Sequence, residues 1–296
     1  MSEGVAIAQT GQFIASRGGH RFRLVSEPAD GQACGTVVFV HAFAEEMNKS
    51  RRMAARAARR LASAGWRVVQ RDLAGCGDSS GDFGDATWEH WLADVREEVI
   101  AAQSHPPVWL WGVRAGALLA CAALWPDARC KLLLWQPVVS GAQHLQQFLR
   151  LHAGARVAGT QSRSDAPSPQ QLLRAGQAVE VGGYRLTPAL ADGLAQASLD
   201  VPAGFDGRVV WIEVSASEPL QMSLAAQRGV DALAGRGVAI DAIVIAGPPF
   251  WQTQEIEDCE ALLAHTNERL TTDGPRPLDG APRATLPARV EGRVTP

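Results

Sequence analysis

Short runs of consecutive apolar residues alternate with segments of helical pattern along most of the chain. The runs at 35–43 and 130–139 are rich in Val, Leu and aromatic residues, which is typical of strands buried on both faces of a sheet. The segments at 49–65 and 87–103 carry apolar residues at helical spacing. This alternation predicts an α/β fold, in which a mostly parallel central sheet forms the middle of a three-layer sandwich.

Further strands extend this sheet at both ends of the chain. Residues 12–28 alternate apolar and polar side chains around Gly18-Gly19, a pattern that predicts a β-hairpin. The apolar runs at 207–214 and 239–247 predict the last two strands, and a helical segment follows them.

The segment between the predicted strands at 130–139 and 207–214 indicates the domain organisation. Residues 140–205 break the alternation, and a cap inserted between sheet elements is the natural use for such a stretch. We therefore expect one domain over residues 1–270 with a cap insertion at about 140–205. Residues 271–296 are rich in proline and have no apolar period, so we expect a disordered tail there.

The composition argues against several classes of function. A net charge of −3 over 296 residues gives no general attraction to nucleic acid or to an anionic membrane. The five cysteines form no CxxC pair, so neither a metal site nor a redox pair is predicted. No apolar segment reaches the roughly 18 residues of a membrane span, and the first residues do not resemble a signal peptide. We expect a reduced, cytoplasmic protein with no cofactor, no metal ion and no nucleic-acid partner.

Residues 112–116 read Gly-Val-Arg-Ala-Gly at a transition from strand to helix. In enzymes with a nucleophile elbow this place reads Gly-x-Ser-x-Gly, because the strained turn needs small neighbours around the nucleophile. The central residue here is Arg114, which cannot be a nucleophile because its guanidinium stays protonated. Ligands of α/β sheets bind at the carboxyl ends of the strands, so the residues after each strand are the candidates for a site.

Other groups near the strand ends offer a weak alternative nucleophile. Cys76 and Ser79 lie in a glycine-rich loop after the predicted strand at 66–73. His41 or Glu45 would then have to act as the base, since a thiol or a hydroxyl is a poor nucleophile without activation. None of these residues has the elbow spacing, so catalytic residues are not assigned.

The positions expected for the acid and the histidine of a catalytic triad can also be located in the sequence. Glu218 follows the strand at 207–214, near where the triad acid usually lies. No histidine occurs from 247 to 254, after the last strand, where the triad histidine is expected. His265 on the closing helix lies roughly 20 Å further along at about 1.5 Å per residue. An orthodox Ser-His-Asp triad is therefore not expected.

The same crevice suits a small ligand. An arginine beside a helix N-terminus favours a carboxylate, phosphate or sulfate, and aromatic residues could form apolar or sugar-stacking walls. Alternatively, Arg114 is a structural partner of Glu45, Glu46 or Glu218, because a buried charge needs a partner. The candidate pocket residues are His41, Phe43, Glu45, Glu46, Asn48, Arg114, Trp135, Gln136, Phe250 and Trp251.

Five stretches between residues 43 and 258 carry a resemblance to a known family. They are "FAEEMNKSRRM", "RDLAGCGDSSGDFGDATWEHW", "LWGVRAGALLA", "LLLWQPVVSG" and "GPPFWQTQEIED". On these stretches the chain resembles the exosortase A system-associated hydrolase 2 family of the α/β-hydrolase superfamily. The resemblance implies an α/β-hydrolase fold and an association with exosortase, with PEP-CTERM protein sorting and with exopolysaccharide production.

Two functions follow from these expectations. The first is a hydrolase with a degenerate triad, since fold alone does not fix activity. The second is a non-catalytic binding or interaction protein, a pseudoenzyme, that uses the crevice around Arg114 for an anionic, acyl or sugar-like ligand. Its cap and tail would then be free to contact sorting or exopolysaccharide machinery.

Overall fold

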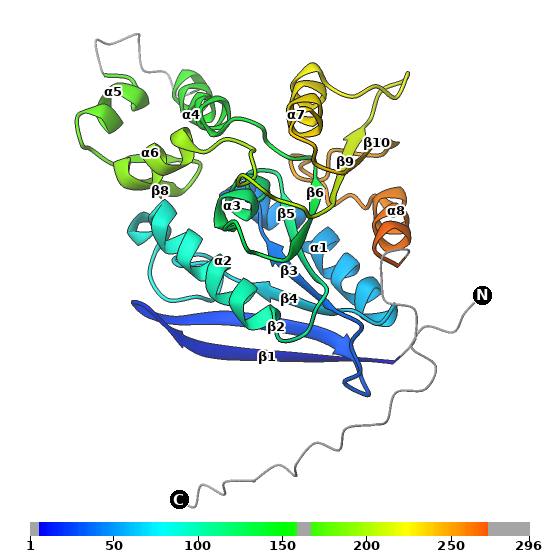
Figure 1. The fold of residues 1–296 in the computed structure, drawn as a ribbon. Helices are drawn as coiled ribbons and strands as arrows, with labels where there is room; N and C mark the ends of the chain where they lie inside the picture. The colour runs from blue at the N-terminus through cyan, green and yellow to red at the C-terminus, as the bar shows by residue number, and fades with distance from the viewer. Residues whose placement is uncertain (1–5, 159–166, 272–296) are drawn as a thin grey trace, which may run out of the picture.

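The computed structural model describes residues 6–158 and 167–271 and contains an eight-stranded sheet in the order β1-β2-β4-β3-β5-β6-β9-β10 (Figure 1). The first two strands form the hairpin predicted around Gly18-Gly19, and β2 pairs antiparallel with β4, whereas the strands of this sheet from β3 onward are parallel to one another. The strands are β1 (Ile7–Ser16), β2 (Gly19–Pro28), β3 (Thr36–Val40), β4 (Arg67–Arg71), β5 (Val108–Val113), β6 (Cys130–Trp135), β9 (Val209–Ser215) and β10 (Ile240–Ala246).

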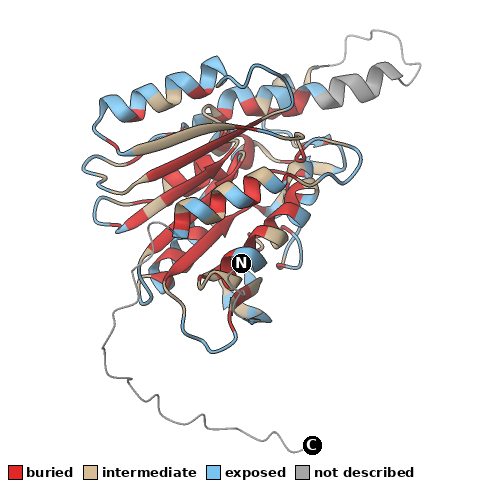
Figure 2. Ribbon diagram, turned by 90° about the vertical axis from the view of Figure 1, so that its right-hand side faces the viewer, coloured by how far each residue is buried: buried red, intermediate tan, exposed pale blue. Residues whose placement is uncertain are grey.

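Helices cover both faces of this sheet. One face packs against α1 (Glu45–Ser63) and α8 (Glu260–Thr271). The other face packs against α2 (Trp88–Ala102), α3 (Gly116–Ala123) and α7 (Leu224–Gly235). Because both faces are covered, β3 and β5 are buried along their whole length (Figure 2). The predicted three-layer α/β sandwich is confirmed.

The chain between β6 and β9 forms a group of small elements beside the sheet, at the upper left of Figure 1. Within it, β7 and β8 pair around Gly182-Gly183, which have φ values of 57° and 85°, so the two glycines make the turn of a tight hairpin. The short helices α5 and α6 have no counterpart among the sequence-based expectations. The elements are α4 (Gly141–Ala158), α5 (Pro169–Arg174), β7 (Val179–Val181), β8 (Tyr184–Leu186) and α6 (Pro188–Gln196).

Two sequence-based expectations can be compared only with the described part of the chain. Of the predicted tail at 271–296, only Thr271, the last residue of α8, belongs to the described residues, and residues 272–296 lie outside them. Within residues 6–158 and 167–271, no helix is long and apolar enough to cross a membrane.

Candidate functional site

A sharp turn joins β5 to α3 and places Arg114 at the carboxyl end of the sheet. Arg114 has a φ of 54°, in the left-handed region that a residue with a side chain rarely adopts. Gly116 lets this turn pack against the end of β3, because a Cβ there would lie 2.4 Å from the carbonyl oxygens of Val40 and His41. The glycine spacing therefore makes the elbow that the sequence predicts, with an arginine at its apex.

Residues with strained backbone dihedral angles cluster at this edge of the sheet. Among the described residues, those other than glycine with positive φ are Ala44, Arg114 and Gln136. They follow β3, β5 and β6 respectively, so all three lie at the carboxyl ends of neighbouring parallel strands. Backbone strain of this kind costs about 1–3 kcal/mol per residue and clusters at functional sites. The strain marks this edge as the candidate site.

Each of the three nitrogen atoms of the Arg114 guanidinium donates a hydrogen bond to the protein. Its Nε and Nη2 donate to Oε1 of Glu46 at 3.2 and 3.0 Å. Its Nη1 donates to the carbonyl oxygen of Gln136 at 3.2 Å, and the group lies 5.3 Å from the centre of the Trp251 ring. Of the partners considered from the sequence, the structure selects Glu46, and Arg114 joins α1 to the strand ends.

A cavity of about 270 Å³ lies beside this ion pair. Its walls come from the start of α1, the elbow, α4 and the loop after β10, so the inserted segment closes one side. Five of the residues proposed from the sequence line it, together with five that sequence reasoning missed. The lining residues are Phe43, Glu45, Glu46, Arg114 and Trp251, and the missed residues Lys49, His144, Gln147, Phe148 and Gln252.

Of the residues that sequence reasoning missed, His144 has the side chain most suited to acid–base chemistry. It lies on α4, is buried, and places its Nε2 3.9 Å from Oε2 of Glu46. Burial lowers the pKa of His144, and the Arg114 charge lowers it further against the opposing effect of Glu46. Oε2 of Glu46 and Nδ1 of His144 are buried without a hydrogen-bond partner. Sequence reasoning had no signal for this residue, because no local pattern shows which face of α4 points at the sheet.

Two aromatic residues proposed as pocket walls lie elsewhere, which corrects the sequence-based assignment. Trp135 is 1% exposed and donates from Nε1 to the hydroxyl of Thr266 at 2.9 Å. Phe250 packs against it with ring centres 6.2 Å apart, and both belong to the core beneath α8. The reason is strand alternation: Trp135 points to the α8 face rather than over the edge of the sheet.

Three more proposed pocket residues have structural partners. Nδ1 of His41 bonds to the carbonyl oxygen of Ala42 at 2.8 Å, and burial lowers the pKa of His41. Oε1 of Gln136 accepts from the amide of Val214 at 2.7 Å. Asn48 donates to the hydroxyl of Tyr184 at 2.8 Å and so contacts β8 rather than the cavity beside Arg114.

The alternative nucleophiles are held in structural roles. Cys76 is buried, and burial raises the pKa of its thiol to about 12. The Ser79 hydroxyl donates to the carbonyl oxygen of Asp72 at 2.6 Å and accepts from the amide of Phe22 at 3.0 Å. Glu218 lies in an exposed loop after β9, beside a separate hollow with Pro248. Neither the thiol nor the hydroxyl is presented to the Arg114 cavity.

Alkylation should reveal the inert state of Cys76. At pH 8 we expect iodoacetamide to modify the half-buried Cys34 at least about tenfold faster than Cys76, because the reactive thiolate of Cys76 is scarce and covered. Peptide mass spectrometry of samples quenched over time measures both rates, and in denaturant the two should become similar. Equal rates in the native protein would restore Cys76 as a nucleophile candidate.

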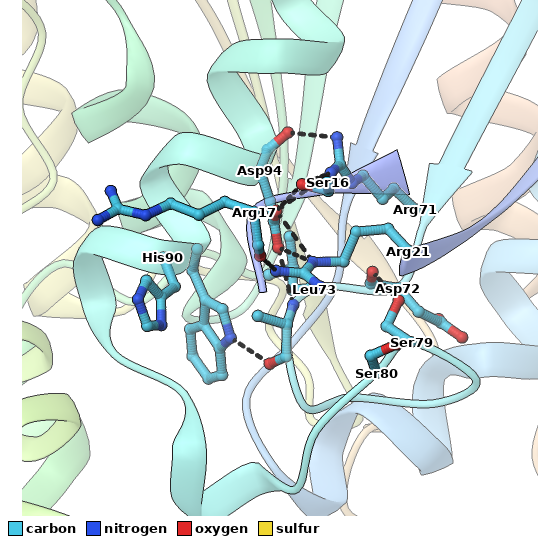
Figure 3. A network of polar contacts seen from close by, with 12 residues as sticks. Ser16, Arg17, Arg21, Arg71, Asp72, Leu73, Ser79, Ser80, His90 and Asp94 are labelled. Carbon is cyan, nitrogen blue, oxygen red and sulfur yellow. Dashed lines mark hydrogen bonds and ion pairs between the residues drawn. The ribbon is translucent and has the colours of Figure 1, made fainter. Parts of the chain in front are cut away.

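A buried charged network holds the neighbouring loop, as Figure 3 shows. Asp94 of α2 accepts from Nε of Arg21 at 2.8 Å and from Nη2 of Arg71 at 3.1 Å. Its Oδ2 also accepts from the amide of Ala74 at 2.8 Å, and Trp91 donates to the carbonyl oxygen of Ala74 at 2.9 Å. The chain after β4 is thereby fixed to β2, β4 and α2. Sequence reasoning did not find this network.

The described residues do not contain a metal-binding cluster of the usual kind. Within 6–158 and 167–271, no group of three or more His, Cys, Asp or Glu residues is arranged to hold a metal ion. The cavity beside Arg114 presents the Arg114–Glu46 pair, the charged groups of Glu45 and Lys49, the imidazole of His144 and an aromatic wall.

Comparisons with known proteins agree with this architecture. The family model described as serine aminopeptidase, S33, matches residues 31–172. Est1E from Butyrivibrio proteoclasticus, in a structure with ferulic acid bound, superposes with a TM-score of 0.62 at 14% identity, covering 88% of this chain and 98% of that chain. A carboxyl esterase from Bacillus coagulans gives 0.57 at 15% identity, covering 90% and 97%.

A third solved structure is also similar to this chain. A variant of monoglyceride lipase from Saccharomyces cerevisiae has a TM-score of 0.57 at 13% identity, covering 88% of this chain and 93% of that chain. None of the curated proteins matches the chain. The sheet order, the elbow and these likenesses define an α/β-hydrolase fold, as the sequence predicts.

Proposed function

We propose that this protein uses the α/β-hydrolase fold to bind a small ligand in the cavity beside Arg114 and does not hydrolyse esters through a Ser-His-Asp triad. The observation that carries the proposal is the residue at the elbow. Arg114 stands where the nucleophile would stand, and its guanidinium is paired with Glu46. The degenerate triad is a consequence of this substitution together with the lack of a histidine at 247–254.

Magnitudes favour binding over triad catalysis. In a serine hydrolase, loss of the nucleophile or the histidine costs about 10⁶ in turnover, and loss of both is no worse because they act as a unit. Binding and polar groups alone leave about 10³–10⁴ over the reaction in water. Of the anionic, acyl and sugar-like ligands considered from the sequence, the acyl and sugar-like classes suit a cavity whose arginine is already paired with Glu46 and whose wall carries several aromatic residues.

The cellular setting follows from the resemblance of the motifs. The five stretches between residues 43 and 258 favour a cytoplasmic protein that works alongside exosortase and exopolysaccharide production. In that setting the cap would be the surface that meets sorting or polymer machinery. Co-purification with such machinery is the direct measurement.

A serine-directed probe tests the proposal. We expect a fluorophosphonate to leave the folded protein unlabelled, and p-nitrophenyl butyrate to be hydrolysed no faster than about 10³–10⁴ times the reaction in water. Intact-mass spectrometry reads the labelling, and an active serine esterase treated in parallel shows that the probe is competent. Stoichiometric labelling that maps to Ser79 or to another serine would overturn the proposal.

A second candidate function rests on His144. Because burial lowers the pKa of this imidazole, Nε2, the ring nitrogen that is not enclosed and that lies 3.9 Å from Glu46, is suited to take a proton from a water molecule in the cavity. The water oxygen would bond to an ester carbonyl carbon, and the proton would then pass to the departing alkoxide. Probe-resistant ester hydrolysis that disappears in His144→Gln would favour this candidate over pure binding.

A further inference from the structure

We propose that Glu46 determines the charge of the ligand that the cavity accepts, and that the wild-type cavity takes uncharged ligands and rejects anions. This inference deepens the proposed binding function and rests on it. It also assigns Glu46 a role that differs from simple support of Arg114: removal of its charge should convert the cavity into an anion site.

The hydrogen bonds of Arg114 already occupy the two donors that an anion would use. An anion binds an arginine best through two parallel N–H donors. Here Nε and Nη2, the two donors on one edge of the guanidinium, both point at Oε1 of Glu46. The third nitrogen is used by the carbonyl oxygen of Gln136. A carboxylate or phosphate would therefore have to displace Glu46 before it could bind this edge.

Displacement of Glu46 is opposed by its surroundings. The Glu46 side chain is only 21% exposed, and its Oε2 is buried beside His144. A Glu46 carboxylate pushed from the arginine would remain close to the incoming anion, and like charges in a partly buried site repel strongly. The internal carboxylate thus acts as a permanent occupant of the anion position.

The charges of the cavity wall, taken together, favour neither an anionic nor a cationic ligand. The ionisable residues of the cavity wall, other than His144, are Glu45, Glu46, Lys49 and Arg114, two acidic and two basic, which sum to zero. Glu45 accepts from the Tyr184 hydroxyl at 3.3 Å, and Lys49 donates to the carbonyl oxygen of Gln252 at 3.3 Å. A cation would meet the same neutral balance as an anion.

The rest of the wall suits an uncharged ring or acyl chain. Phe43, Phe148 and Trp251 are all buried, and the rings of Phe43 and Phe148 meet edge to face at 5.1 Å. Gln147 and Gln252 add amide groups that can bond to a hydroxyl or a carbonyl. A small neutral molecule with one apolar part and one or two oxygen atoms complements this lining.

Three probes of the same size test the inference: benzyl alcohol, benzoate and benzylamine. Titration calorimetry with the full chain at pH 7.5 should show that benzyl alcohol binds wild-type protein at least tenfold more tightly than benzoate or benzylamine. In Glu46→Gln the negative charge is removed and the two donors of Arg114 face only a neutral amide oxygen, which an anion can displace, so benzoate should gain at least tenfold in affinity while benzyl alcohol changes by less than about threefold.

Glu45→Gln is the matched control. It removes one negative charge from the adjacent residue of the same cavity, but Glu45 makes its contacts with Asn48 and Tyr184. It should raise the affinity for benzoate by less than about threefold. A double variant, Glu46→Gln with Arg114→Met, should lose the benzoate gain, which would assign the gain to the guanidinium.

The outcomes separate this inference from the binding function beneath it. Equal affinity of wild-type protein for benzoate and benzyl alcohol overturns the inference, and this comparison does not depend on how any variant folds. A folded Glu46→Gln that still rejects benzoate also overturns it. If none of the probes binds, both the inference and the binding function fail, whereas labelling by a fluorophosphonate removes the non-hydrolytic function alone.

Discussion

Replacement of Asp94 by alanine is expected to lower the free energy of unfolding by about 3–5 kcal/mol, because it leaves buried positive charge without its partner. Asp94 accepts from both Arg21 and Arg71, and the side chains of all three are at most 4% exposed. Arg71 retains Glu98, but Arg21 loses its carboxylate. Chemical denaturation followed by tryptophan fluorescence measures the change.

The exposed end of the same network provides the control. Glu97 accepts from Nη2 of Arg71 at 2.9 Å, but its side chain is 50% exposed. Because water replaces a surface ion pair at little cost, Glu97→Ala should change stability by at most about 1 kcal/mol. If the two variants are equally stable, the buried network does not hold the loop after β4 in the way we infer.

Replacement of Gly116 by alanine should be nearly as damaging, with an expected loss of about 3 kcal/mol or more. The added Cβ would lie 2.4 Å from the carbonyl oxygens of Val40 and His41, which end a central strand. No flexible side chain can move aside, so α3 or β3 has to shift. The same shift would disturb the Arg114–Glu46 pair, since Arg114 lies in the turn before α3 and Glu46 lies on α1, which follows β3.

Gly235→Ala is the matched substitution. Gly235 is the last residue of α7, and a Cβ built there meets no atom within 4 Å. We expect a change within about 1 kcal/mol, with a small gain in stability as the favoured sign. Thermal unfolding of both variants, with circular dichroism to confirm a native fold, tests the difference. A Gly116→Ala protein as stable as Gly235→Ala would show that the elbow is not packed against β3 as described.

The sheet could be predicted from local patterns, but the direction of individual side chains could not. Trp135 shows the difference. Its strand is apolar on both faces, so no period of two tells which residues point to α8 and which to α3. The proposal that Trp135 lines the site therefore failed, although the strand that carries it was predicted.

His144 was missed for a related reason. It lies on α4, in the inserted segment, and no local pattern shows which side of this helix faces the sheet. Only the packing of α4 over the start of α1 brings the imidazole near Glu46. Phe148 follows one turn later on the same helix and reaches the same cavity, as residues four apart on a helix do.

The sequence by itself determined the alternation of strands and helices, the glycine-framed elbow and the arginine at its apex. Each of these depends on composition or spacing within a few residues, which is why it can be seen without a structure. Only the tertiary structure decided that Arg114 pairs with Glu46 rather than with Glu45 or Glu218. Neighbouring helix residues point about 100° apart, and loops of unknown path separate the others, so the partner of a charge 68 residues away is set by packing alone.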